Sequence, residues 1–372
     1  MEITTRSFVL SLAGIGIMVM MMMTSSAEAT MPAVFVLGDS TVDVGTNNFL
    51  TGSVDRADFP HNGIDFPGSK ATGRFSNGYN IADFLAKQLG LEMSPPPFFS
   101  LGNGTAPLNN SSFKGVNFAS GGSGILDTTG LSPDGVKMVV PLSEQVQQLG
   151  SISSRLASFK GAETAADYLA TSVFIISIGS NDMFHYDHDN SSSSSSSTKE
   201  QFISQVTATY QKHLRTMLGF GVRKIGIIST GPVGCCPSQR RFNQTSGCLE
   251  PLNELAVSFN AKVKTMMAHL SSEFDGMQYS IGDTYSMTMN LIKSPASYGF
   301  KNINTACCGL GKLNADFFCT PDANVCTNRD EMLFWDMFHP SQAASKLAAS
   351  DLYNGGQPFV TPINFKQLAA AF

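Results

Sequence analysis

Positive charge is scarce in this sequence, and no cluster of basic residues occurs anywhere in it. The 372 residues include 24 Lys and Arg against 29 Asp and Glu, a formal net charge of −5. This balance argues against nucleic acid as a main partner, because a polyanion is attracted by a basic surface. Tryptophan is nearly absent as well, since Trp335 is the only one. The sequence therefore shows no aromatic platform for sugars.

Only one long apolar run is present, and it lies near the first residue. An apolar segment over 8–23 follows Arg6, and Ala27-Glu28-Ala29 then places small residues around a cleavage site. This order is typical of a secretory signal peptide, so we expect residues 1–29 to be removed by cleavage between Ala29 and Thr30. A membrane anchor is the alternative, but the run is somewhat short for a span. No later segment is apolar enough to cross a bilayer, so we expect a secreted, extracellular chain without an integral membrane span.

Cysteine is absent from the first half of the chain. All seven cysteines lie in loop-like stretches of the second half: Cys235, Cys236, Cys248, Cys307, Cys308, Cys319 and Cys326. This usage favours disulfides in an oxidising compartment. Zinc is the alternative, but the spacings fit no common finger pattern, and we expect no metal. The spacing alone does not fix which cysteines pair.

A possible nucleophile follows the first apolar run of the mature chain. Val34 to Leu37 has the composition of a short buried strand, and Gly38 and Asp39 end it because both residues suit turns. Ser40 is thereby left just past the carboxyl end of the strand. In an open α/β sheet this edge is where ligands bind. The position suits a serine nucleophile, provided that a base reaches it.

Three other stretches supply the groups that such a serine needs. Asp336 and His339 are three residues apart, so one turn can present both, with the carboxylate orienting the imidazole toward a serine. Asn181 follows the apolar run 173–178 and carries an amide suited to an oxyanion. The stretch 115–122 is strand-like and ends in glycines, where backbone N–H groups can approach a ligand closely.

Strands and helices alternate along the chain. Strands are expected at 34–37, 115–122, 173–178, 224–229 and 277–281, and helices at 79–89, 142–159, 201–219, 250–274 and 341–353. Alternation of this kind predicts a parallel sheet, here of five strands, with helices on both faces.

Together these motifs resemble the GDSL esterase/lipase family of SGNH hydrolases, and most closely its secreted plant branch. The resemblance covers about residues 33–353 through Gly38-Asp39-Ser40, Gly115 to Gly124, Gly179-Ser180-Asn181-Asp182 and Phe334 to Pro340. Each motif is weak alone, but four in this order are specific. One departure is Thr41, which stands where the family name implies Leu; the position is not itself catalytic.

The resemblance implies a three-layer α/β/α fold in which residues 30–372 form a single domain. It implies ester hydrolysis through an acyl-enzyme, with Ser40 as nucleophile, His339 as base and Asp336 orienting it. The backbone N–H groups of Ser40 and Gly121 and the side chain of Asn181 would hold the oxyanion, although Gly122 is equally able. No cofactor is required, and the substrate would be a small-molecule, lipid or polymer ester.

The resemblance also implies a pattern of disulfides. Cys235 would pair with Cys248, and the remaining four cysteines would pair among themselves: Cys307, Cys308, Cys319 and Cys326. In the family the turn after the fourth strand carries one Cys before Leu-Pro, whereas here Cys236 replaces that Leu. Cys236 would therefore be the odd thiol.

Two other functions use the same residues. The chain could be an acyltransferase that passes the acyl group to an alcohol, or an inactive relative that binds carbohydrate or cell wall. Residues 190–198 are rich in serine and predict a disordered loop, and the His and Asp residues just before them favour a solvated loop over a metal site. Asn-x-Ser/Thr sequons begin at Asn103, Asn109, Asn110, Asn190 and Asn243, of which Asn109 and Asn110 overlap.

Overall fold

The computed structural model describes residues 33–102, 108, 113–132, 134–192 and 198–371, all within one unit of the chain that spans 31–372. The predicted signal peptide and its cleavage site lie outside the described residues, as do the sequons at Asn103, Asn109 and Asn110.

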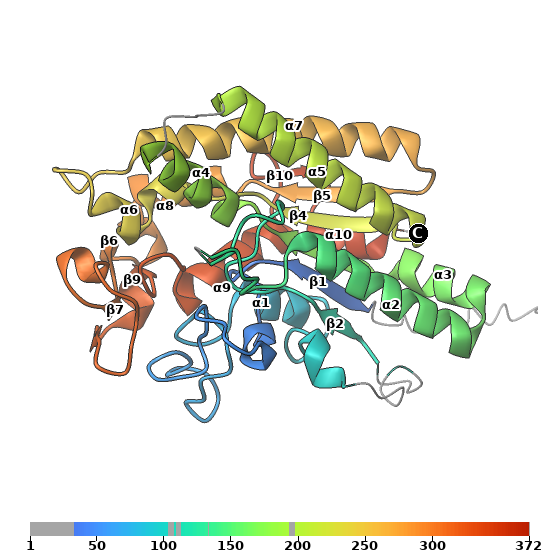
Figure 1. Ribbon diagram of the computed structural model, residues 1–372, viewed down its shortest axis with the longest axis horizontal. Helices are drawn as coiled ribbons and strands as arrows, with labels where there is room; N and C mark the ends of the chain where they lie inside the picture. The colour runs from blue at the N-terminus through green and yellow to red at the C-terminus, as the bar shows by residue number, and fades with distance from the viewer. Residues whose placement is uncertain (1–32, 103–107, 109–112, 133, 193–197, 372) are drawn as a thin grey trace, which may run out of the picture. The chain divides into compact units, whose positions relative to one another are not determined.

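A six-stranded sheet forms the centre of this unit (Figure 1), in the order β10-β5-β4-β3-β1-β2. Five strands are parallel: β1 (Val34–Gly38), β2 (Gly115–Asn117), β3 (Val173–Ser177), β4 (Lys224–Ile228) and β5 (Gln278–Gly282). The predicted parallel sheet is thus confirmed. The sequence did not reveal β10 (Val360–Pro362), which pairs antiparallel with β5 at the edge. The inner strands read as continuous apolar runs because helices cover both of their faces.

Helices cover the two faces of the sheet, as the family resemblance implies (Figure 1). The core on one face joins Phe35 and Phe174 of the sheet to four helices: α2 (Leu142–Lys160), α3 (Ala162–Thr171), α5 (Lys199–Gly219) and α7 (Glu250–Glu273). The core on the other face contains Val34 and Val36 and three helices: α1 (Ile81–Gln88), α9 (Gln342–Asn354) and α10 (Phe365–Ala370). The fold is therefore the expected three-layer α/β/α arrangement.

Three further helices lie near the carboxyl ends of the strands: α4 (Ser180–Ser192), α6 (Pro237–Arg240) and α8 (Thr284–Lys293). Helix α4 replaces the expected turn at 179–182 and continues into the stretch that was expected to be a disordered loop. Residues 193–197 of that stretch lie outside the described residues. Short 3₁₀ turns occur at Thr46–Phe49, Phe98–Leu101, Val233–Cys235, Pro295–Tyr298, Lys312–Asn314 and Arg329–Glu331.

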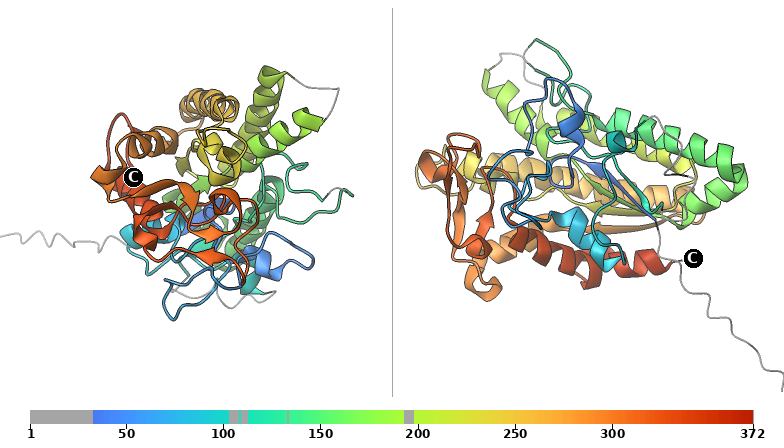
Figure 2. Two further views of the ribbon diagram at one scale, coloured as in Figure 1. Left: turned by 90° about the vertical axis from the view of Figure 1, so that its left-hand side faces the viewer. Right: turned by 90° about the horizontal axis from the view of Figure 1, so that it is seen from below.

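Two small sheets lie beyond one end of the central sheet, in the orange segment of Figures 1 and 2. They pair β6 (Asn302–Ala306) with β9 (Met332–Phe334) and β7 (Cys308–Gly309) with β8 (Asn324–Val325). Disulfides Cys307–Cys326 and Cys308–Cys319 cross-link this segment. Trp335 is fully buried in the same cluster, and its indole N–H donates to Asn62 Oδ1 at 2.9 Å. The disulfides and the Trp335–Asn62 hydrogen bond thus fix the position of the chain just before Asp336.

The third disulfide joins Cys235 to Cys248, and Cys236 is a free, buried thiol. The Cys236 Sγ donates to the carbonyl oxygen of Phe338 at 3.5 Å. Burial raises the pKa of the Cys236 thiol to about 12, and the charge of Asp336 acts in the same direction. Cys236 therefore stays a neutral thiol at physiological pH.

Candidate active site

Ser40 lies directly after β1, where the backbone makes an abrupt turn. Gly38 makes this turn possible, because its φ is +151° and a side chain there would lie 2.1 Å from the carbonyl oxygen of Ser177 on β3. The side chain of Gln145 on α2 fixes the turn from the other side. It accepts from Gly38 N–H and donates to Gly38 O, both at 2.8 Å. The turn that precedes Ser40 is thus held by a buried amide on a different layer of the fold.

Thr41, the departure from the family pattern, has a specific role beside Ser40. Its backbone N–H and its hydroxyl both donate to Asp39 Oδ1, at 3.0 and 2.6 Å, and the hydroxyl lies 2.8 Å from Ser177 Oγ. Asp39 is almost fully buried. Burial raises the pKa of Asp39 to about 6, although the two hydrogen bonds from Thr41 oppose the shift. Thr41 thus supplies a hydroxyl donor that a leucine side chain would lack.

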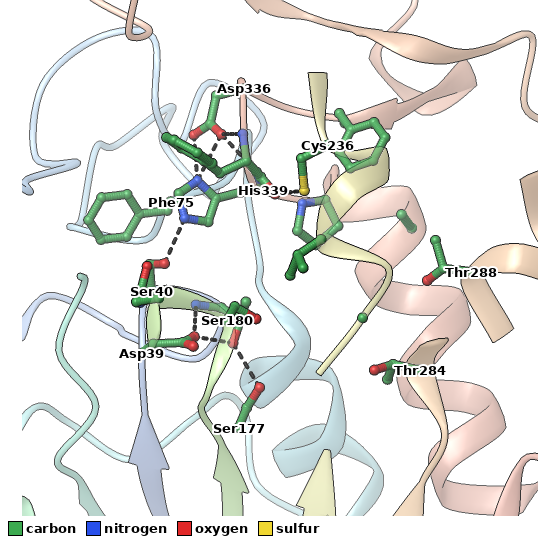
Figure 3. Close-up of a pocket in the computed structure, with 18 of the residues that line it drawn as sticks. Asp39, Ser40, Phe75, Ser177, Ser180, Cys236, Thr284, Thr288, Asp336 and His339 are labelled. Atoms are coloured by element: carbon green, nitrogen blue, oxygen red, sulfur yellow. Dashed lines mark hydrogen bonds and ion pairs between the residues drawn. The ribbon is translucent and has the colours of Figure 1, made fainter. Parts of the chain in front are cut away.

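His339 and Asp336 come from the loop that follows β9, and they meet Ser40 at the end of the central sheet (Figure 3). His339 Nε2 lies 2.7 Å from Ser40 Oγ. His339 Nδ1 lies 2.8 Å from both carboxylate oxygens of Asp336. Asp336 Oδ1 also accepts the backbone N–H groups of Phe338 and His339, at 2.9 and 2.8 Å. One carboxylate therefore orients both the imidazole and the loop that carries it.

Carboxylates determine the charge state of His339. Burial lowers the pKa of its imidazole, but Asp336 raises it through its charge and its hydrogen bond, and the nearby charges of Asp39 and Asp55 act in the same direction. The attractions outweigh burial, so the pKa of His339 lies above its ordinary value. The imidazolium is therefore favoured once the imidazole has accepted a proton.

Asn181 lies at the start of α4 and lines the same cavity as Ser40. Its side-chain amide donates one hydrogen bond to the carbonyl oxygen of Ser123 at 2.9 Å, which leaves its second N–H for a ligand. The next residue, Asp182, accepts the backbone N–H groups of Ile125 and Leu126 at 2.9 and 3.0 Å. Helix α4 thereby holds the loop that follows the glycines of 121–124.

The expected role of Gly121 needs correction. Its N–H donates to Asp43 Oδ2 at 2.8 Å, so this hydrogen is already used within a buried network. Gly122, in contrast, lines the cavity, and neither its N–H nor that of Ser40 donates a hydrogen bond within the described part of the chain. Burial raises the pKa of Asp43 to about 6 against three N–H donors from Gly45, Thr46 and Gly121. The geometry favours Gly122 as the backbone donor beside Ser40.

A cavity of about 1100 Å³ opens beside Ser40 and extends toward α8. Its wall is mostly apolar and includes Met287 and Leu291 of α8. Several of its lining side chains are exposed apolar groups, among them Val54 at 79%, Phe242 at 65% and Phe318 at 62%. A cavity of this size and composition suits the apolar part of an organic ester.

Several residues that shape the site gave no signal in the sequence. Gln145 and Asp55 lie in stretches without a recognisable motif, whereas Asp182 could have been suspected because it adjoins Asn181.

Among the described residues, no group of three or more His, Cys, Asp or Glu side chains is arranged to hold a metal. The sequon residue Asn243 donates its amide to the Cys248 carbonyl oxygen at 3.2 Å. The backbone of Asn190 lies within α4.

No helix in the described ranges combines the length and apolar character needed to cross a membrane.

Comparison with known proteins agrees with this architecture. Residues 34–352 match the model of the GDSL-like lipase/acylhydrolase family. Among curated proteins, one GDSL esterase/lipase of Arabidopsis thaliana is 36% identical over 86% of this chain and 88% of its own length. Two others from the same plant are 36% and 35% identical, each over 92% of this chain and over 91% and 90% of their own lengths. The chain therefore belongs to the GDSL-like lipase/acylhydrolase family and is a carboxylic ester hydrolase.

Proposed function

We propose that this hydrolase is a secreted serine esterase that works through a Ser40–His339–Asp336 triad and an acyl-enzyme. The observation that supports the proposal is a continuous line of contacts from Ser40 Oγ to His339 Nε2 at 2.7 Å and from His339 Nδ1 to Asp336 at 2.8 Å. These distances lie within the reach required of a nucleophile, its base and the group that orients the base.

In the first half of the reaction, Ser40 Oγ attacks the ester carbonyl carbon while its proton passes to His339 Nε2. The pair of electrons displaced from the carbonyl bond forms an oxyanion. When the intermediate collapses, the alcohol leaves with the proton from His339 and the acyl group stays on Ser40. Asp336 holds the imidazole in the tautomer whose Nε2 is free and stabilises the imidazolium.

In the second half, a water molecule takes the place of the alcohol. His339 accepts its proton, the hydroxide attacks the acyl carbon, and the acid leaves as Ser40 recovers its hydrogen. The oxyanion of both halves would be held by the N–H groups of Ser40 and Gly122 and by the free amide N–H of Asn181. One such donor contributes about 3 kcal/mol to lowering the barrier.

Secretion is the second part of the proposal. It is supported by the signal-like segment 1–29 and by the three disulfides, which persist in oxidising compartments. N-terminal sequencing of the exported protein should begin at Thr30, and an intact Met1 on the exported protein would contradict this.

The decisive experiment replaces Ser40 by alanine. The variant should lose ester hydrolysis and covalent labelling by a fluorophosphonate probe, because the atom that attacks is gone. Ser180→Ala is the matched control, since Ser180 lines the same cavity without contacting His339, and it should keep both properties. Wild-type turnover by a folded Ser40→Ala variant would show that the assignment is wrong.

A further inference from the structure

Asp55 is a carboxylate that lines the cavity beside Ser40, and the described part of the chain offers its side chain no hydrogen-bond or ion-pair partner. Among the other acidic residues that line the cavity, Asp336 is bonded to His339, Asp39 accepts from Thr41, and Asp351 is exposed. The side chain of Asp55 is half-buried and, within the described part of the chain, accepts no hydrogen bond and forms no ion pair. Its neighbour Arg56 is bonded to Asp58 instead. Asp55 thus presents an unsatisfied anion to the cavity.

The position of this carboxylate is fixed on both sides. A Cβ atom built on Gly122 would lie 2.5 Å from Asp55 Oδ2, so the carboxylate lies directly against that glycine. The side-chain amide of Asn47 donates to the backbone oxygens of both Asp55 and Gly121, at 2.7 and 2.9 Å, and so ties the two segments together. Asp55 is also close enough to interact with the charge of His339. It therefore lies on the wall of the cavity that His339 also lines, beside the glycine pair.

The part of the cavity that Asp55 lines corresponds to the alcohol moiety of an ester substrate. His339 returns its proton to the departing alcohol, so the alcohol moiety must lie beside His339 Nε2 when the intermediate collapses. Asp55 lines the same cavity as His339 and lies against Gly122, so its carboxylate can face the alcohol, while the apolar extension toward α8 can hold the acyl chain. Carboxylates are acceptors only when ionised, and they form charge-assisted hydrogen bonds with hydroxyl donors.

We propose that Asp55 recognises a hydroxyl group on the alcohol moiety, so that the enzyme prefers esters of polyols over esters of simple alkanols with the same acyl chain. The inference rests on the proposed function, since it places the alcohol by reference to His339. Glycerol and sugar esters share the required chemistry. Partial burial, which raises the pKa of Asp55, is the penalty that a hydroxyl donor would offset.

The test compares two esters that differ only in hydroxyl groups: propyl butanoate and 2,3-dihydroxypropyl butanoate. Acid release is followed by pH-stat titration, and the quantity measured is the ratio of their kcat/KM values. Each variant supplies its own ratio, so any effect of Asp55 on the pKa of His339 affects both esters and cancels. The wild-type enzyme should favour the dihydroxypropyl ester by about 10- to 100-fold, the usual value of one hydrogen bond to a charged group.

Asp55→Ala should bring the ratio to about 1, whereas Asp55→Asn should keep part of the preference because the amide oxygen still accepts. Glu92→Gln is the control, as Glu92 is an exposed carboxylate that does not line the cavity; its ratio should equal that of the wild type. Fluorophosphonate labelling of each variant verifies that the site is assembled.

An equal loss on both esters, or an unchanged ratio in Asp55→Ala, would overturn the proposal, as would a wild-type enzyme without preference. Failure of the proposed function would look different. In that case Ser40→Ala would still hydrolyse both esters, whatever happened at Asp55.

Discussion

Replacing Asp336 by asparagine should separate the two tasks of this carboxylate. Asp336 Oδ1 accepts two backbone N–H groups, from Phe338 and His339, as well as lying near His339 Nδ1. In Asp336→Asn the amide oxygen will occupy that place, because only an oxygen can accept the two backbone hydrogens. The amide nitrogen must then take the Oδ2 position, 2.8 Å from His339 Nδ1 in the wild type.

The consequence is a change of tautomer. The amide oxygen at the Oδ1 place already accepts two backbone N–H groups, so the donor opposite Nδ1 favours the tautomer in which that nitrogen accepts. The ring proton then lies on Nε2, which faces Ser40 Oγ. The base nitrogen is then occupied, and kcat should fall by about 10⁴-fold, the magnitude known for this change in a Ser-His-Asp triad. The loop keeps both backbone hydrogen bonds, so the free energy of unfolding should stay within about 1 kcal/mol of the wild type, the scale of one ordinary hydrogen bond.

Asp336→Ala is the comparison that completes the argument. It also removes the orientation of His339, but it leaves the partly buried N–H of Phe338 and the buried N–H of His339 without this acceptor. Each orphaned group costs about 1–3 kcal/mol, so this variant should unfold at lower denaturant concentration. Hydrolysis of a chromogenic ester and denaturant titration measure the two effects. An asparagine variant within tenfold of wild-type activity would refute the tautomer argument, and equal stability of the two variants would refute the role of Oδ1 in the loop.

The other predictions concern pH, the oxyanion and the thiol. Because the pKa of His339 lies above its ordinary value and the imidazole must be neutral to accept a proton, kcat/KM should rise with pH through a limb above about 6.5; Asp336→Asn should move this limb to lower pH, and a pH–rate profile checks both. Asn181→Ala should lower kcat by about 10²–10³ while fluorophosphonate labelling of Ser40 persists, and unchanged turnover would remove Asn181 from the oxyanion site. Cys236 should resist alkylation in the native protein and react after unfolding, as mass mapping can show, because burial keeps it neutral.

The parts of the fold with strong periodicity were predictable from sequence. The helix expected at 250–274 is α7 at Glu250–Glu273, since its apolar residues recur on one face. Helix α4 was missed because its residues are mostly polar and, among those of its side chains that the structure describes, only Asp182 and Met183 are buried. The strand β10 was missed for another reason. It spans only Val360–Pro362 and ends in a proline, so its identity depends on pairing with β5.

Some residues of the candidate site were predictable from sequence, whereas others depend on contacts between distant parts of the chain. The residue types at Ser40, Asp336 and His339 follow from local motifs, and the structure brings these three side chains into contact. Choosing between Gly121 and its neighbour depends on the carboxylate of Asp43, which is 78 residues away in the sequence. The role proposed for Asp55 could not be predicted from sequence either. It depends on the residues that surround Asp55 in the cavity, and the local sequence around Asp55 contains no motif.

The hydrogen bond between Ser40 and His339 also has a consequence for biosynthesis. It joins residues 299 positions apart, so the nucleophile is translated long before its base. At about 5–20 residues per second, the interval is roughly 15–60 s. During this time the nascent chain carries a serine that nothing deprotonates, and β10 emerges later still. Under the proposed mechanism, a translation product that stops before His339 lacks the base and should not hydrolyse esters.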